Sequence, residues 1–231
     1  MGELFDKYAN EYVDIINRGS KITGEKFEYF INLRVQLMRR KIREIEDSPS
    51  HILDFGCGIG YTEKVIRNYF PNSFIVGIDR SEISINKANS LNLLNTQFIC
   101  QRSLSLPFAD NTFDVIYSNG TFHHIEHSDH TSIFREFLRI LKRNGHFFVF
   151  ENNPYNPLMM RAMKNNPFDK DAHVIYPVDL KKRTLLVGFK IKGVNYYMFY
   201  PKWFKILRWT ERYIRFVPLG AQYFLWGTKK F

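Results

Sequence analysis

The sequence predicts an α/β fold in which a mostly parallel sheet is covered by helices on both faces. Between residues 51 and 151, short apolar runs alternate with longer amphipathic runs, and this alternation is typical of parallel sheets. The chain has 231 residues, of which 45% are hydrophobic and 24% charged. That length and composition suit one large domain with a substantial core.

The expected elements follow one another in a regular order. Apolar residues at helical spacing predict a helix around Tyr8–Ile16 and a longer one over Phe27–Ile45. Strands and helices then alternate. We expect strands at 51–55, 74–78, 96–100, 113–118 and 146–151, and helices at 62–69, 81–90 and 128–142.

The pattern loosens after Glu151. Prolines mark an irregular connection of about 25 residues between 152 and 177, and a connection of that length is a candidate for function. We expect a helix at 178–186, a strand at 189–200, a helix at 202–215 and a last strand at 221–228. We divide the chain into an N-terminal helical cap (1–48), a ligand-binding core (49–151) and a second-ligand segment (152–231).

Composition excludes several classes of protein. The sequence has no apolar run long enough to cross a membrane and no signal-peptide pattern at its start. Its two cysteines, Cys57 and Cys100, do not form a Cys-x-x-Cys motif, which argues against a disulfide framework or a zinc site. We therefore expect a cytoplasmic protein. The net charge of +10 is compatible with RNA or an anionic membrane, but no nucleic-acid module is readable and we expect no DNA partner.

A glycine-rich loop follows the first predicted strand in "HILDFGCGIGYTEKVI". It lacks the Gly-Lys-Ser/Thr of a phosphate loop. Asp54 lies two positions before the first glycine and would repel a pyrophosphate, but it suits a ligand with an ammonium or sulfonium group. Asp79, at the end of the next strand, is placed to accept hydrogen bonds from a ribose. A nucleoside with a cationic attachment fits both, and S-adenosylmethionine is such a molecule.

These motifs resemble those of the class I S-adenosylmethionine-dependent methyltransferases. "ILDFGCGIGYT" and "IVGIDRS" are similar to the first two motifs of that family, and "SLPFADNTFDVIYSNGTFHHI" is similar to the third and fourth. The resemblance implies a Rossmann-like, seven-stranded, mostly parallel sheet with an antiparallel last strand. It also implies a set of cofactor-binding residues: Tyr12, Asp54, Gly56, Cys57, Gly58, Gly60, Asp79, Arg80, Gln101, Ser103, Asn119 and Gly120.

Within that set the resemblance implies particular roles. The three loop glycines let the backbone approach the methionine part, Asp79 holds the ribose and Arg80 flanks the adenine. The family has an acidic residue for the adenine amino group where this chain has Gln101 and Arg102. Since an arginine accepts no hydrogen bond, we expect Gln101 or the backbone of Ser103 to hold the adenine.

Two histidines, His123 and His124, follow the fourth predicted strand. Histidine is the usual base at neutral pH, so either is a candidate catalytic residue, although both could simply stabilise the turn. His124, His127 and His130 are three apart, but a predicted helix start at Ser128 or Asp129 separates them and no carboxylate with ligand spacing lies nearby. We therefore expect no metal site.

Polar residues end the fifth predicted strand in "ENNPYNP". This segment resembles the "E-H-N-P-x-N-P" of a narrower bacterial group whose members resemble enzymes of surface-glycan or lipid-linked metabolism. Asn152 stands where that group has histidine. The residues expected to bind the acceptor, if they do not merely begin a polar loop, are Glu151, Asn152, Asn153 and Tyr155.

The segment "KWFKILRWTERYIRF" carries a basic stripe at helical spacing, with apolar side chains on its other side. Such a helix either packs its apolar face on the sheet or lies on an anionic membrane. Peripheral contact with the inner face of the membrane through Lys202–Arg215 is thus one of two alternatives.

Together these observations predict a metal-independent methyltransferase. It would move the methyl group of S-adenosylmethionine to an oxygen or nitrogen atom of a small or lipid-linked acceptor, such as a sugar. One alternative is an RNA methyltransferase, which the charge favours and the missing RNA-binding module disfavours. The other is a protein that binds the cofactor without catalysis.

Overall fold

The computed structural model describes residues 12–19, 23–43 and 48–230. Of the expected N-terminal helix, Tyr8 lies outside these residues and α2 (Tyr12–Gly19) is its described part. The side chain of Tyr12 is also outside the described part, so its expected contact with the cofactor stays a prediction.

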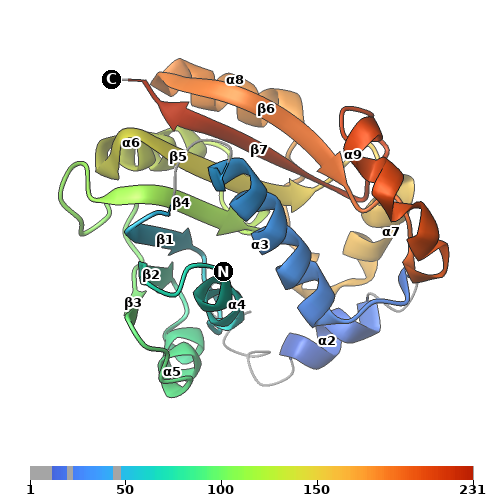
Figure 1. The fold of residues 1–231 in the computed structure, drawn as a ribbon, viewed down its shortest axis with the longest axis horizontal. Helices are drawn as coiled ribbons and strands as arrows, with labels where there is room; N and C mark the ends of the chain where they lie inside the picture. Colours follow the sequence, from blue (N-terminus) through green and yellow to red (C-terminus); the bar gives the residue numbers. More distant parts are fainter. Residues whose placement is uncertain (1–11, 20–22, 44–47, 231) are drawn as a thin grey trace.

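A seven-stranded sheet forms the centre of the molecule, with the strand order β3-β2-β1-β4-β5-β7-β6 (Figure 1). The first five strands run parallel, and β7 is antiparallel to both of its neighbours. This confirms the expected fold class. The strands are β1 (His51–Phe55), β2 (Phe74–Asp79), β3 (Thr96–Cys100), β4 (Phe113–Asn119), β5 (Leu141–Asn152), β6 (Phe189–Tyr197) and β7 (Gln222–Lys229).

Helices cover both faces of the sheet (Figure 1). On one face, apolar side chains of α3 (Phe27–Arg43) and α4 (Tyr61–Tyr69) pack with Tyr117, Phe148 and Trp226 of the strands. On the other, α6 (His130–Ile140) and α8 (Pro177–Val187) enclose a cluster built on Phe134, Phe137 and Leu180. The remaining helix of the core, α5 (Glu82–Ser90), packs against β2 and β3.

The strand and helix boundaries agree with expectation to within a few residues, with two exceptions. The first is β5, which begins at Leu141 rather than at residue 146. Leu141 pairs with Phe113, an irregularity follows, and the regular register resumes at His146 opposite Val115. The helix before it, expected to run to residue 142, therefore ends at Ile140.

The second exception is the proline-rich connection, which is not structureless. It contains α7 (Pro157–Asn165) and a short 3-10 helix, η3 (Pro167–Asp169). Asn156 and Asn166 begin them, each accepting a backbone N–H with its side-chain oxygen, from Met159 and Phe168 respectively. Each asparagine is followed by a proline, a residue well suited to the first helical position.

Candidate active site

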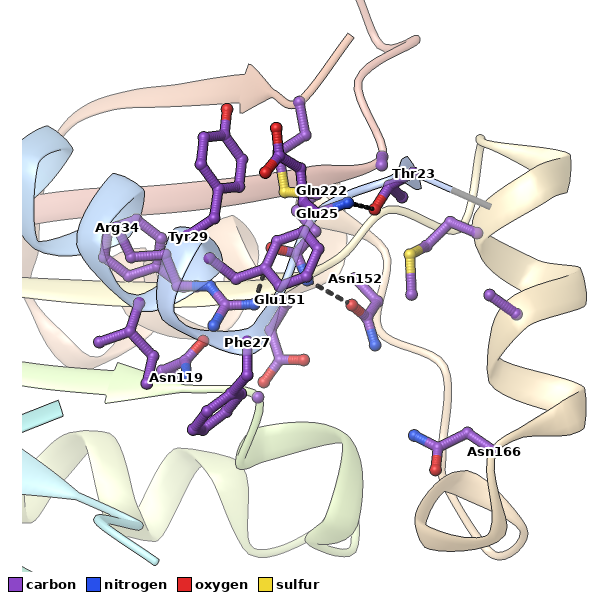
Figure 2. A pocket seen from close by; sticks show the side chains of 18 of the residues that line it. Thr23, Glu25, Phe27, Tyr29, Arg34, Asn119, Glu151, Asn152, Asn166 and Gln222 are labelled. Atoms are coloured by element: carbon purple, nitrogen blue, oxygen red, sulfur yellow. Dashed lines mark hydrogen bonds between the residues drawn. The ribbon is translucent and has the colours of Figure 1, made fainter. Parts of the chain in front are cut away.

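The carboxyl ends of β1, β4 and β5 open into a cavity of about 400 Å³. It extends from the glycine-rich loop, along α3 and α7, to the segment after β6 (Figure 2). Such a crevice is where α/β sheets bind their ligands. The expected site residues that line it are Asp54, Gly56, Cys57, Gly58, Asn119, Gly120, His123, His124, Glu151 and Asn152.

The three loop glycines have three different roles. At Gly58 the backbone φ is +53° and an added Cβ would meet nothing within 4 Å, so this residue leaves open space for a ligand. A Cβ on Gly56 would overlap Thr121. A Cβ on Gly60 would lie 2.9 Å from Ala88 and 3.0 Å from Phe98. The missing side chain at Gly60 therefore allows α4 to pack closely on α5 and β3, and the expected contact of Gly60 with the cofactor stays a prediction.

Asp79 links the loop to the end of β2. One carboxylate oxygen accepts the N–H of Gly58 at 2.9 Å and the other accepts the N–H of Ser81 at 2.9 Å. Ser81 in turn caps α5 by accepting the N–H of Ser84 at 3.0 Å. The carboxylate is thereby held at the tip of the strand, and its contact with a ribose stays a prediction.

Asp54 lies at the other side of the loop and is 1% exposed, next to the fully buried Glu63. Burial and the charge of Glu63 raise the pKa of Asp54 well above its usual value. Burial likewise raises the pKa of Glu63 to about 8. Among the described residues, the Oδ1 atom of Asp54 has no hydrogen-bond partner. A buried acidic group with one unpartnered oxygen at the cavity fits a cationic ligand, whose charge would favour the ionised carboxylate.

The remaining residues expected at the adenine differ from expectation. The side-chain amide of Gln101 donates to the carbonyls of Ser103 and Ser105, at 3.1 and 2.6 Å, and so fixes its own loop. Arg80 and Ser103 are exposed, and none of these three residues lines the cavity. The adenine contact of Gln101 or Ser103 stays a prediction, with the Gln101 oxygen as its available acceptor.

A buried histidine lies between two carboxylates at the centre of the cavity wall. His123 Nδ1 is 2.5 Å from Glu151 Oε2, and His123 Nε2 is 3.2 Å from Asp169 Oδ1. The second oxygen of Glu151 accepts the N–H of Phe122 at 2.9 Å. The neighbouring ring of His124 places its Nε2 atom 3.8 Å from Asp169 Oδ1. The sequence analysis missed Asp169, which belongs to η3 in the long connection.

This arrangement moves the two histidine pKa values in opposite directions. Burial lowers the pKa of His123, but the charge of Glu151 and hydrogen bonds to Asp169 and Glu151 outweigh it and raise that pKa to about 10. Burial and the charge of His123 lower the pKa of His124 to about 3. An efficient general base titrates near the working pH. The structure thus brings both candidates to the cavity but tunes neither as a base at neutral pH.

His127 and His130, which the sequence analysis considered together with His124 as metal ligands, lie away from this group. The Nε2 atom of His130 bonds to the carbonyls of Phe122 and Ile125, at 3.0 and 3.1 Å, so this ring holds the turn after β4. His127 is exposed on the surface. The histidine set considered for a metal in the sequence is therefore not the set that the fold assembles.

A polar chain lies along the wall formed by α3, β5 and β7 (Figure 2). Arg34 donates to Gln222 Oε1 at 2.9 Å, and Gln222 Nε2 donates to Asn152 Oδ1 at 2.8 Å. Asn152 is thus held beside the cavity, and its contact with the acceptor stays a prediction. Sequence patterns did not single out Arg34 or Gln222, because they lie 188 residues apart in elements that look like ordinary core segments.

Two expected acceptor residues do not reach the cavity. Asn153 is fully buried, and its amide donates to the carbonyls of Pro218 and Gly220, at 3.1 and 2.7 Å. Its oxygen accepts the N–H of Tyr155 at 3.1 Å. The acceptor role predicted for Asn153 is therefore wrong, because its side chain is used to join the end of β5 to the turn before β7. Tyr155 is exposed and contacts the ring of Tyr176.

The segment expected as one amphipathic helix is a 3-10 helix, η4 (Lys202–Thr210), followed by α9 (Glu211–Ile214). Of the two alternatives for this segment, the one in which its apolar face packs on the sheet is wrong. Polar side chains attach it instead: Glu211 accepts the N–H groups of Met198, Phe199 and Tyr200. Its apolar side chains point to solvent, with Ile206 79% and Trp209 64% exposed.

The sheet order and the cavity define a Rossmann-like domain with a nucleoside site beside its first strand. Residues 52–145 match the family model described as "Methyltransferase domain". This part of the chain therefore has the methyltransferase domain that the sequence motifs predict. The match confirms the resemblance to the class I S-adenosylmethionine-dependent methyltransferases and S-adenosylmethionine as the cofactor. Three residues fit that cofactor: the backbone of Gly58 faces open space, Asp54 has a buried oxygen without a partner, and the Asp79 carboxylate is held in place.

Two curated methyltransferases are similar in sequence to part of this chain. A demethylmenaquinone methyltransferase of Thermotoga maritima is 30% identical over 155 residues, which are 66% of this chain and 62% of that protein. A malonyl-[acyl-carrier protein] O-methyltransferase of Legionella pneumophila is 25% identical over 147 residues, 63% of this chain and 47% of that protein. The chain thus spans about half the length of the curated relatives it matches.

Among solved structures, a complex between the Trm112 methyltransferase activator of Haloferax volcanii and a methyltransferase contains a similar chain. The two chains superpose with a TM-score of 0.67 at 16% identity, covering 98% of each. At that identity the likeness concerns the fold.

Proposed function

We propose that the protein transfers a methyl group to an oxygen or nitrogen atom of a small or lipid-linked acceptor of largely apolar character. One observation carries the proposal: a single cavity joins the cofactor loop at Gly58 to aromatic side chains at Tyr200 and Trp203. Where the cavity runs along α7, the apolar side chains of Leu158 and Met159 line it as well. A small apolar molecule entering at the aromatic end would reach the cofactor end with its reactive atom.

The residues of the chain then have separable tasks. The bound cofactor supplies an electrophilic methyl group. The Gly58 backbone, Asp54 and Asp79 would hold it, while Asn152 orients the acceptor through its amide. Methyl transfer is an in-line displacement, so positioning and exclusion of water can provide most of the rate acceleration. This suits a site in which no histidine is tuned as a base.

We further propose that the segment from Lys202 to Leu219, called here the aromatic-basic surface, docks on an anionic membrane. Its exposed apolar side chains are Trp203, Phe204, Ile206, Leu207, Trp209, Tyr213, Phe216, Val217 and Leu219. Exposed Lys202, Lys205 and Arg212 lie among them. Aromatic and cationic groups together match the interface of an anionic bilayer. No helix among the described residues is long and apolar enough to span a membrane, so contact would be peripheral.

The proposed reaction is tested with S-adenosylmethionine carrying a labelled methyl group. Purified protein is incubated with a lipid extract, a water-soluble extract and total RNA, and the label is followed by mass. We expect a gain of one methyl group in a lipid or another apolar small molecule. Label in RNA alone, or cofactor binding with no transfer to any extract, would contradict the proposal.

Membrane docking is tested by flotation with liposomes of phosphatidylglycerol or of phosphatidylcholine. We expect the wild type to float with the anionic liposomes at low salt. The double variant Trp203→Ser/Trp209→Ser should lose this, whereas Leu94→Ser is the matched control because Leu94 is 81% exposed in a distant loop. Docking by this surface would be ruled out if the wild type did not float with the anionic liposomes. It would also be ruled out if the double variant Trp203→Ser/Trp209→Ser floated as well as Leu94→Ser.

A further inference from the structure

His123, His124 and Asp169 bring three metal-ligating groups to one side of the cavity. One atom from each, a ring nitrogen of either histidine and a carboxylate oxygen, lies within 4.8 Å of the other two. The two histidines come from the turn after β4 and the aspartate from η3, 45 residues further along the chain. The side chains of His123 and Asp169 are 5% and 7% exposed. We propose that these three residues bind one divalent transition-metal ion at the cavity wall.

The separations suit a common ion. With metal–ligand bonds of about 2.0–2.2 Å, two ligand atoms at adjacent positions lie about 3–3.5 Å apart. Asp169 Oδ1 is 3.2 Å from His123 Nε2 and 3.8 Å from His124 Nε2. All three ligand atoms lie within 4.8 Å of one another, so an inward turn of the His124 ring, whose side chain is 12% exposed, is needed to complete the geometry.

The neighbours of these ligands resemble the outer shell of a metal site. A metal-bound histidine characteristically donates its other N–H to a carboxylate, which fixes the ring. Here Glu151 Oε2 lies 2.5 Å from His123 Nδ1, on the side of the ring away from Asp169. Asp169 is held in the same way, because its second oxygen accepts the amide of Asn166 at 2.8 Å. Both supporting contacts leave His123 Nε2 and Asp169 Oδ1 directed toward each other.

The ligand types favour particular metals. Two imidazoles and one carboxylate suit Zn²⁺, Fe²⁺, Co²⁺ or Ni²⁺ better than Mg²⁺ or Ca²⁺, which prefer oxygen ligands. Three protein ligands also leave positions open for a further molecule. The role of the ion rests on the proposed function: it would bind an oxygen atom of the acceptor and orient it in the cavity. Binding of the ion itself does not depend on that function.

This inference reverses the expectation of a metal-independent site, and the reason is physical. The sequence argument looked for a carboxylate close to the histidines along the chain. The ligating carboxylate comes instead from Asp169, which η3 returns to the carboxyl end of β4. No sequence spacing predicts that return.

The experiment uses the full chain, stripped with a chelator and titrated with Co²⁺ while visible absorption and heat are recorded. We expect one Co²⁺ per chain, with the absorption of a site containing nitrogen and oxygen ligands. Asp169→Asn and His124→Ala should each weaken binding at least about 10-fold. His173→Ala is the matched control, since it removes an exposed histidine that is paired with Glu126.

Binding of S-adenosylhomocysteine to each protein is measured in parallel. Its retention in Asp169→Asn shows that the variant is folded and that the cofactor half of the proposed function holds. If wild-type protein binds S-adenosylhomocysteine but takes up no Co²⁺, the metal site is refuted and His123 is an imidazolium held by two carboxylates. Co²⁺ binding that is equal in wild type and Asp169→Asn also refutes it.

Discussion

The carboxylate of Asp79 accepts the backbone N–H of Gly58 at 2.9 Å. This hydrogen bond joins the tip of β2 to the one loop glycine that faces open space. Because the same carboxylate also accepts the N–H of Ser81, it sets the position of the loop and of the start of α5 together. The predicted ribose contact and the shape of the loop therefore depend on one side chain.

Replacing that side chain should affect cofactor binding more than folding. We expect Asp79→Ala to weaken S-adenosylhomocysteine binding by about 10- to 100-fold, since the lost hydrogen bonds involve a charged group worth about 1.5–3 kcal/mol. Isothermal titration measures the affinity. Glu82→Ala, which removes an exposed acidic residue three positions away, should bind normally. Equal affinities for the two variants would show that Asp79 does not hold the cofactor.

The loop glycines should respond differently to the same substitution. In Gly58→Ala the new methyl group enters open space, so the protein should fold, with a cost of about 1–2 kcal/mol for the left-handed backbone, but lose cofactor affinity. Gly56→Ala adds an overlap with Thr121 to a φ of +84°, and should lose more stability. Urea unfolding and cofactor titration compare them. Normal cofactor affinity in Gly58→Ala would contradict the role given to this loop.

The buried pair of Asp54 and Glu63 should make stability depend on pH. The folded pKa of Glu63, about 8, lies above its usual value of 4.5, so the folded state holds this proton more tightly. Its contribution to stability is complete below pH 4.5 and is lost as the pH rises toward 8. Glu63→Gln should therefore reduce the fall in melting temperature between pH 5 and pH 8, measured without cofactor. Parallel curves for the two proteins would contradict the raised pKa.

Arg139 should be a major stabilising residue of the loop before β4. Its guanidinium donates to Glu136, to Asp110 and to the carbonyls of Leu106 and Phe108. Because the group is partly exposed, we expect Arg139→Ala to cost about 1–3 kcal/mol, with little recovery in Arg139→Lys, which lacks the planar fork. Chemical unfolding measures this. Arg135→Ala, at an exposed position of the same helix, is the control, and an equal loss there would refute the proposed role.

Much of the fold could be predicted because its signals are local. The strand and helix periods and the glycine loop each depend on neighbouring residues, and the structure agrees closely with the strand at 74–78 and the helix at 81–90. The predictions failed where contacts between residues far apart in the chain determine how a segment packs. The segment after Pro201 has the pattern of a packed amphipathic helix, yet Glu211 and Arg208 bond to the end of β6 and leave the apolar side chains outside.

The candidate site divides in the same way. Asp54, the loop glycines, Asp79 and the two histidines were found from the sequence, since each directly follows or ends a predicted strand. Asp169, Arg34 and Gln222 were missed, because each belongs to a different element and reaches the cavity only in the folded chain. Asn153 was misassigned, since a motif does not show whether a polar residue faces a ligand or the core.

The sequence by itself therefore determined the class of fold, the cofactor and the end of the sheet at which the cavity lies. These follow from short-range periodicity and from a loop whose residues are contiguous. Only the tertiary structure decided which side chains face the cavity, what surrounds His123 and which surface of the last helices is exposed. Those properties depend on packing and hydrogen bonds between residues far apart in the chain. Burial and neighbouring charges shift the pKa values of the site only after folding has brought such residues together.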